Sequence, residues 1–166
     1  LLAHGAPVDV VVRGGTAVMA AAMNGQLEAL RLLLAAPGGE AAVNLQDDGV
    51  TALSQAALCG CTAEARLLLQ HGADPNLADN DGDSPLLRAA MASGDAGRGV
   101  AALLLDAGAE IDHQNKEEGA TALMFACQCS NVEVARLLLE RSHQRLCGWL
   151  ATASCLAFTS APAPSR

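Results

Sequence analysis

Apolar residues, mostly alanine and leucine, gather in four similar segments separated by polar, glycine-rich stretches. Each segment opens on a glycine, any residue, and then threonine or serine. The four starts read "GGTAVMAAAMNG", "GVTALSQAALCG", "GDSPLLRAAMAS" and "GATALMFACQCS". Because alanine and leucine have high helix propensity, the pattern predicts an all-α protein. Its first helices are expected near residues 17–24, 52–59, 85–93 and 122–129.

Each predicted first helix is followed by a second apolar segment that ends in Leu-Leu-Leu. Polar exits such as "HGADPN" and "AGAEID" come next and predict an extended finger. The threonine or serine hydroxyl can accept from the free N–H groups that open a helix, and Pro85 suits a first helical turn. Gly25, Gly60 and Gly94 are placed to end the first helices. Each unit is therefore expected to hold two short antiparallel helices and a finger.

The unit recurs along the chain with a nearly constant period. The hydroxyl residues Thr16, Thr51, Ser84 and Thr121 are 35, 33 and 37 residues apart. The extra residues fall in "AAPGGEAAVN", "GDAGRG" and "IDHQNKEEG", which we interpret as connections because loops accept insertions most readily. The array over residues 1–141 then divides into a partial unit at 1–11 and units at 12–46, 47–78, 79–114 and 115–141, the last incomplete at its end.

These repeats resemble those of the ankyrin repeat family. The resemblance rests on "DGVTAL", "DGDSPL", "EGATAL", the paired alanines and "LLLQHGADPN", and it covers residues 1–141. It implies an ankyrin-repeat solenoid of stacked helix-turn-helix units with short extended finger loops. The family's proline after threonine is present only as Pro85, and its Leu-His pair is replaced in every unit. That histidine links neighbouring repeats in the family, so its replacement implies a less stable array.

Small residues occupy equivalent places on the predicted first helices. They are Ala21-Ala22, Ala56-Ala57, Ala89-Ala90 and Ala126-Cys127. Small side chains let adjacent first helices approach closely, while the leucine triplets fill the layer behind, so we expect a curved stack with first helices and fingers on its concave side. Cys127 is expected to be buried at an alanine place and to act as a small hydrophobe.

Charge and composition narrow the class of partner. The chain has a net charge of −8, and residues 1–140 hold 7 basic and 18 acidic residues. Binding to nucleic-acid phosphates requires lysine and arginine, which are scarce here. We therefore expect that the partner is not a nucleic acid but a protein with a basic patch. No run reaches the roughly 18 apolar residues that span a membrane. The six cysteines are irregularly spaced and are interpreted as reduced thiols of a monomer in the cytoplasm or the nucleus.

The pairs "CGC" and "CQC" are the most tempting candidates for a metal or redox site. Cys59 and Cys129 each follow their hydroxyl residue by eight positions, but in the second and fourth units. Two layers of packed helices separate them by roughly 20 Å, which is too far for a disulfide or a shared zinc ion. The acidic "DNDGD" lacks the spacing of a calcium loop. We therefore expect no metal, no cofactor and no catalytic residues.

The resemblance implies a binding surface on finger tips and on the exposed ends of first helices. Asp79 is left out because it matches a structural residue of the turn. An alternative is that the acids only keep the fingers soluble. The candidate partner-binding residues are Arg13, Met23, Asp47, Asp48, Leu58, Asn80, Asp81, Asp83, Met91, Glu117, Glu118 and Gln128.

Residues 142–166 depart from the repeat pattern. They contain no acid, the chain's single Trp and a closing "APAPSR", which cannot remain helical. Three interpretations are open: a capping helix, a segment unrelated to the array from alternative splicing or a gene-model error, and a membrane-surface or partner-docking segment. For the whole chain, we expect a non-enzymatic scaffold or adaptor that binds a protein. The alternative is the regulatory portion of a larger enzyme or channel.

Overall fold

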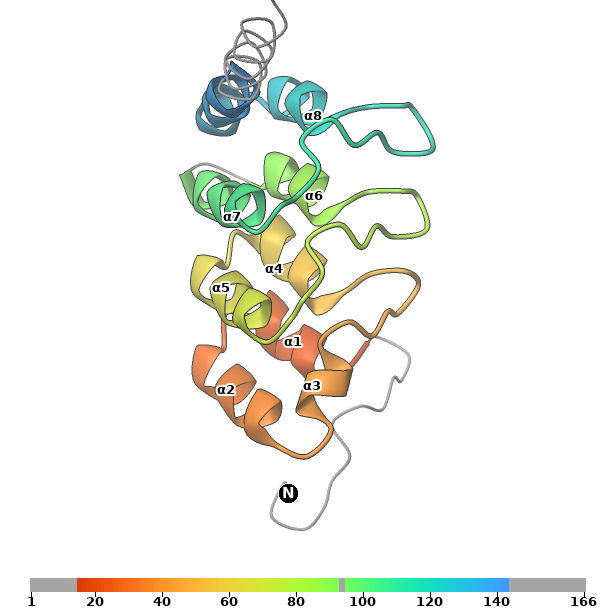
Figure 1. Cartoon of the computed structure of the whole chain (residues 1–166), viewed down its shortest axis with the longest axis vertical. Helices are drawn as coiled ribbons and strands as arrows, with labels where there is room; N and C mark the ends of the chain where they lie inside the picture. The colour runs from red at the N-terminus through yellow and green to blue at the C-terminus, as the bar shows by residue number, and fades with distance from the viewer. Residues whose placement is uncertain (1–14, 93–94, 144–166) are drawn as a thin grey trace, which may run out of the picture.

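The chain forms a stack of antiparallel helix pairs in the computed structural model, which describes residues 15–92 and 95–143 (Figure 1). A one-turn helix, α3 (Gly39–Ala42), lies in the connection after the first pair. The first helices of the pairs are α1 (Ala17–Met23), α4 (Ala52–Cys59), α6 (Pro85–Met91) and α8 (Ala122–Gln128). The second helices are α2 (Leu27–Ala35), α5 (Thr62–Gln70), α7 (Asp95–Asp106) and a last helix described over residues 132–143.

This architecture confirms the predicted all-α solenoid. Each predicted first helix is present within two residues of its expected ends, and each second helix contains the Leu-Leu-Leu triplet near its carboxyl end. Isolated bridges pair Asp47 with Val50 and Gln114 with Thr121. No helix of the described ranges is long and apolar enough to cross a membrane. The partial unit at 1–11 and residues 144–166 of the divergent tail lie outside the described residues.

Hydroxyl side chains open three of the four first helices, as predicted. Thr51 accepts a hydrogen bond from the amide of Ser54 at 3.1 Å, and Ser54 Oγ accepts from the Thr51 amide at 3.0 Å. Thr16 and Ser84 accept in the same way from residues three positions later. Thr121 is an exception, because its side chain makes no capping hydrogen bond. Ser54 occupies the position of the family's histidine, and its hydroxyl adds a second hydrogen bond to the cap of its own helix.

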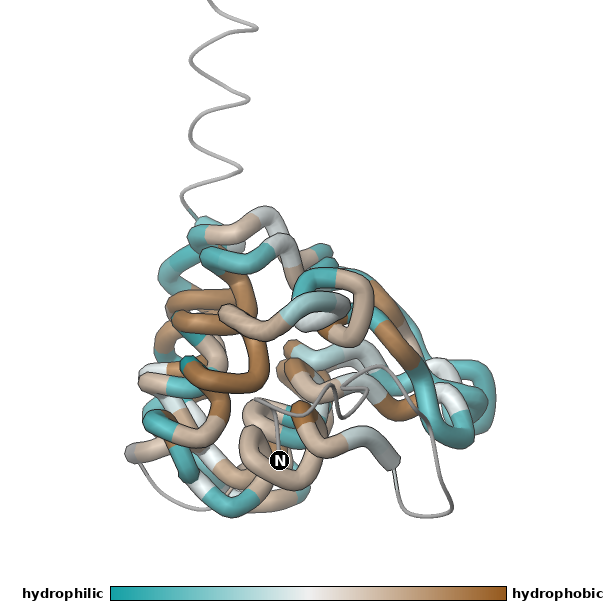
Figure 2. Tube along the Cα trace, turned by 90° about the horizontal axis from the view of Figure 1, so that it is seen from below, coloured by the Kyte–Doolittle hydropathy of each residue, from teal (hydrophilic) through white to brown (hydrophobic). Residues whose placement is uncertain are grey.

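The core lies between the row of first helices and the row of second helices. The paired alanines of α1, α4 and α6 are at most 4% exposed, and Leu30, Leu68, Leu104 and Leu138 fill the layer behind them. Successive first helices pack more closely on one another than successive second helices do. Seen from the amino-terminal end of the stack, hydrophobic residues gather in the helical part and hydrophilic residues at the ends of the fingers (Figure 2).

The insertion "GDAGRG" is not a connection, contrary to the sequence-based expectation. Helix α7 begins at Asp95, so most of the insertion lengthens α7 to 12 residues, compared with 9 in α2 and α5. Its glycines explain how the extra turn fits. A Cβ on Gly97 would lie 2.6 Å from the carbonyl oxygen of Ala89, and one on Gly99 would lie 2.9 Å from Thr62 Oγ1. The first turn of α7 thus touches α6 and α5 closely because it has no side chains there.

The hydroxyl caps lead to a matched pair of stability predictions. Replacing Thr51→Ala removes the buried hydroxyl that accepts from the Ser54 amide and should lower the free energy of unfolding by about 1–2 kcal/mol. Thr121→Ala removes no side-chain cap and should cost roughly 0.5 kcal/mol or less. Urea unfolding followed by circular dichroism measures both. Equal losses in the two variants would contradict the assignment of Thr51 as the stronger cap.

Candidate protein-binding surface

The first finger is a tight hairpin that begins and ends in a backbone pair. The Asp47 amide donates to the Val50 carbonyl at 3.0 Å, and the Val50 amide donates to the Asp47 carbonyl at 2.9 Å. Asp48 and Gly49 form the turn with φ angles of 50° and 81°, as the Asp-Gly pair of a type I′ turn does. A Cβ on Gly49 would lie 2.5 Å from the amide nitrogen of Asn80, so glycine also allows the second finger to approach.

The second finger, residues 79–83, is organised by one buried carboxylate. Asp79 Oδ1 accepts from the amides of Asp81 and Asp83 at 3.1 and 2.8 Å. Its other oxygen forms an ion pair with the guanidinium of Arg88 on α6. Both partners are largely shielded, since the side chain of Asp79 is 2% exposed and that of Arg88 is 17% exposed. This confirms that Asp79 holds the turn and is not part of the surface.

The third finger, residues 115–120, is tied to the second by four contacts. The Lys116 amide donates to the Asp81 carbonyl at 2.9 Å, and Lys116 Nζ donates to the Asn80 carbonyl at 3.4 Å. Asn115 Nδ2 donates to Asp83 Oδ1 at 3.2 Å. His113 Nε2 lies 2.8 Å from the Gly82 carbonyl oxygen, to which it donates. These contacts fix the spacing of the second and third fingers.

A second set of contacts joins the bases of neighbouring fingers through asparagine. Asn44 donates from Nδ2 to the Gly72 carbonyl at 3.0 Å and accepts from the Asp74 amide at 2.9 Å. Asn76 repeats this with the Gly108 carbonyl at 3.2 Å and the Glu110 amide at 2.8 Å. At these two junctions, one unit therefore positions the next through side-chain bonds to its backbone.

Most of the predicted partner-binding residues reach the surface of the fingers and first helices. Asp48, Asn80, Asp81, Glu117, Glu118, Met23 and Gln128 are exposed, and Asp47, Leu58 and Met91 are half-buried. Arg13 lies outside the described residues.

Asp83 differs from the expectation of an exposed acid. It is only 9% exposed and accepts from Asn115 of the third finger. The reason is its place at the base of the finger, next to the cap of α6, where the following finger covers it. We use the name tip acids for the exposed acids Asp48, Asp81, Glu117 and Glu118.

A groove lies between the first finger and the first helices of two units. Its volume is about 250 Å³. Met19 and Met23 on α1 and Val50 on the finger make part of its lining apolar, which we call the floor. Asp47 and Asp48 on the finger make another part acidic, which we call the rim. Gly15, Ala20 and Gln55 complete the lining. The structure thus brings together three residues that the sequence nominated separately: Met23, Asp47 and Asp48.

Sequence reasoning missed three residues that shape this surface. Lys116 places a cation beside the tip acids of the second finger, Arg88 neutralises Asp79, and Met19 floors the groove. Arg88 follows its hydroxyl residue by four positions, and Met19 follows its own by three. On a helix, these offsets share a face with the cap, which is the signal that could have found them.

The cysteine pairs remain free thiols in the described part of the chain. Cys59, Cys61, Cys127 and Cys129 are all unpaired, and no three His, Cys, Asp or Glu side chains there are placed to hold a metal ion. Burial raises the pKa of the Cys61 thiol, and the charges of Glu64 and Cys59 raise it further. Such a shift makes Cys61 a poorer thiolate nucleophile.

The expected burial of Cys127 is wrong, because its side chain is exposed. The equivalent residues Ala57 and Ala90 are each covered by the first helix of the following unit, as α4 packs on α6 and α6 on α8. In the described residues, α8 has no such neighbour on that side.

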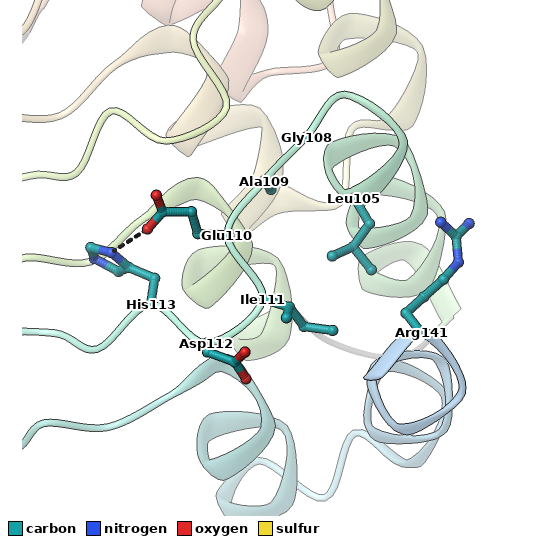
Figure 3. Close-up of a pocket in the computed structure, with 8 residues that line it drawn as sticks. All are labelled: Leu105, Gly108, Ala109, Glu110, Ile111, Asp112, His113 and Arg141. Atoms are coloured by element: carbon teal, nitrogen blue, oxygen red, sulfur yellow. Dashed lines mark ion pairs between the residues drawn. The ribbon is translucent and has the colours of Figure 1, made fainter. Parts of the chain in front are cut away.

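A larger cavity, of about 590 Å³, opens away from the fingers (Figure 3). It lies between Leu105 at the end of α7, residues 108–113, and Arg141 of the last helix. His113 Nδ1 is 3.9 Å from Glu110 Oε2, and Arg141 pairs with Asp106 at 2.8 Å. These polar groups face one another in pairs along the wall, and they do not converge on a common point as groups of a catalytic site do.

Comparison with known proteins agrees with this geometry. A family model described as ankyrin repeats in three copies matches residues 1–79, 20–115 and 73–147. The chain is also similar to the ankyrin repeat and KH domain-containing protein mask-1 of Caenorhabditis elegans. The two are 32% identical over 132 residues, which is 80% of this chain and 5% of that protein. The chain therefore spans a small fraction of the length of this relative.

The division between structural and surface acids can be tested with one pair of variants. Asp79→Ala leaves the guanidinium of Arg88 without its carboxylate and two amides without their acceptor, so it should cost about 3 kcal/mol of unfolding free energy. Asp81→Ala removes an exposed tip acid and should change stability by about 0.5 kcal/mol or less. Urea unfolding of the two variants gives both values. A similar loss for both would show that the tip acids also hold the fold.

Proposed function

Because this chain belongs to the ankyrin repeat family, we propose that it is a non-enzymatic interaction module that binds its protein partner on the fingers and first helices. Ankyrin repeats are in general protein–protein interaction modules. The observation that supports this face most directly is the set of finger-to-finger bonds, which hold the tip acids in place without a partner. A preformed surface loses little conformational entropy on binding.

The chemistry of the face favours a partner with a basic patch. The tip acids come from three successive fingers, and one cation, Lys116, lies among them in the described residues. Each exposed charge alone contributes under about 1 kcal/mol. Together they create a field that speeds encounter with a cationic partner and is screened by salt. The exposed and half-buried apolar residues Met23, Leu58 and Met91 lie on the adjacent helix ends and would supply the buried anchors that dominate affinity.

A second candidate is that this array regulates a larger protein from within. The observation that favours it is the match to 5% of the length of mask-1, a protein named for a KH domain as well as for its repeats. In this case the partner is another part of the same polypeptide, and the scaffold or adaptor role does not apply. The same face of the fingers would be used in either case, with this chain acting as a monomeric binding unit.

Charge reversal of three tip acids tests the proposal. The variant Asp48→Lys, Asp81→Lys, Glu118→Lys should still fold, because none of the three side chains makes a hydrogen bond or ion pair among the described residues. Lysine at the φ of 50° of Asp48 should cost about 1 kcal/mol of unfolding free energy. Proteins captured from cells by the unaltered chain and lost from this variant, as quantified by mass spectrometry, are candidate partners. With a purified candidate, the association rate at low salt should fall by roughly an order of magnitude, and high salt should abolish the difference.

A matched control carries the same change in net charge at a distance from the finger tips. Glu28→Lys, Glu40→Lys, Glu140→Lys alters exposed acids on α2, α3 and the last helix. This variant should retain the partner and its association rate. If a partner still binds the variant with reversed tip acids but no longer binds the control variant, binding on the fingers is refuted. A salt-dependent contact seen in a longer chain with no added protein would favour the regulatory candidate.

A further inference from the structure

The groove beside the first finger combines an apolar floor with an acidic rim. Met19 and Met23 are one helical turn apart on α1, so both side chains face the same side of the helix. The sulfur of Met19 accepts from the Thr16 amide at 3.5 Å, which holds that side chain down as a fixed floor. Met23 is 44% exposed and is free to adjust to an occupant. Methionine is flexible and polarisable, and it adapts well to varied partners.

The rim carboxylates take no part in the ion pairs or the finger contacts of the described residues. Asp47 uses its backbone, not its side chain, to close the hairpin, and Asp48 forms the turn with its backbone. None of the ion pairs among the described residues includes either carboxylate. Two adjacent carboxylates at a partly desolvated rim attract a cation more strongly than one exposed acid does.

The second finger shows that this fold can pair a finger carboxylate with a cationic side chain. There, Arg88 follows the capping Ser84 by four residues and lays its guanidinium against Asp79. In the preceding unit, Gln55 follows the capping Thr51 by four residues, so a neutral amide stands at the place of the arginine. Gln55 also lines the groove. Gln46 stands five residues before Thr51, at the place of Asp79, so the first finger has neither member of that ion pair. Its carboxylates Asp47 and Asp48 take the places of Asn80 and Asp81, and its own helix offers them no cation at the place of Arg88.

We infer that this groove is the anchor site for one lysine or arginine side chain of the partner protein. The methylene stem lies on Met19 and Met23, and the cationic head pairs with Asp47 and Asp48. Long basic side chains bury their stems on apolar surface while the charge stays at the rim. The inference rests on the proposed function and adds to it a single position on the partner, whereas the tip acids act through their combined field.

Methionine methyl NMR tests this directly, because the chain's four methionines report separately. Met19 and Met23 lie in the groove, while Met91 and Met124 lie on α6 and α8. The probe is a blocked Gly-Arg-Gly tripeptide, with Gly-Lys-Gly as a second probe and Gly-citrulline-Gly as the neutral match of arginine. The two cationic probes should shift the Met19 and Met23 signals saturably and leave Met91 and Met124 unchanged. The citrulline peptide should bind about fivefold more weakly than the arginine peptide.

Two variants of equal charge complete the design. Asp47→Asn, Asp48→Asn removes the rim charges and should weaken binding of the arginine peptide about fivefold. Asp81→Asn, Glu117→Gln makes the same change in net charge on the next two fingers and should leave the affinity at the groove nearly unchanged. Equal binding of arginine and citrulline peptides, or equal weakening by both variants, would overturn the inference.

The chain's own Arg13 is the rival occupant. If Arg13→Ala moves the Met19 and Met23 signals before any probe is added, and the unaltered chain ignores the peptides, the groove belongs to the chain itself and the inference is wrong. Failure here remains distinct from failure of the proposed function. If no peptide binds the groove and the partner still fails to bind the charge-reversed variant, only the anchor site is refuted and the proposed function stands. If the peptides bind but no partner protein depends on the finger face, the proposed function is refuted, and with it the role of the groove in recognising a partner.

Discussion

The structure depends on hydrogen bonds between neighbouring units, most of which involve a backbone group. A finger is too short to satisfy its own amides and carbonyls, and groups left unsatisfied and shielded from water would be costly. The neighbouring unit supplies the partners: Asn44 and Asn76 bridge the bases, and Asn115 and Lys116 bind the second finger. The helices supply the apolar burial, but these bonds set the register in which the fingers stand.

This constraint divides the acids of the fingers into two groups. Asp79 and Asp83 lie where fingers meet, and both are buried. Asp79 accepts from two amides and pairs with Arg88, and Asp83 accepts from Asn115. The tip acids lie beyond these contacts and keep their carboxylates in solvent. A surface with fixed spacing and free charges follows from the same hydrogen-bond pattern. The groove beside the first finger forms where that pattern meets the methionines of α1.

The sequence alone predicts the structural features that residues within one unit determine, such as the positions of the helices. The hydroxyl, the small residues five and six positions after it and the leucine triplet placed the helices correctly. Each of these residues acts within one helix or against an equivalent residue of another unit. The predictions were wrong where contacts with a neighbouring unit determine burial or helix formation. Asp83 is covered by the following finger, and Cys127 is exposed because no following helix covers it among the described residues. "GDAGRG" became helical because its glycines fit against Ala89 and Thr62, a contact between helices that the local sequence does not reveal.

Amide hydrogen exchange measures the central claim, which is that neighbouring units hold the fingers before any partner binds. The amides of Asp74, Glu110 and Lys116 donate to Asn44, Asn76 and Asp81 of the preceding unit. The amide of Glu117, at the tip, donates to no acceptor among the described residues. In the isolated chain, the first three should exchange roughly tenfold or more slowly than Glu117, because they open only when a finger or its neighbour does. Exchange at the rate of Glu117 in all three would show that the fingers are not held, and that the binding surface is not preformed.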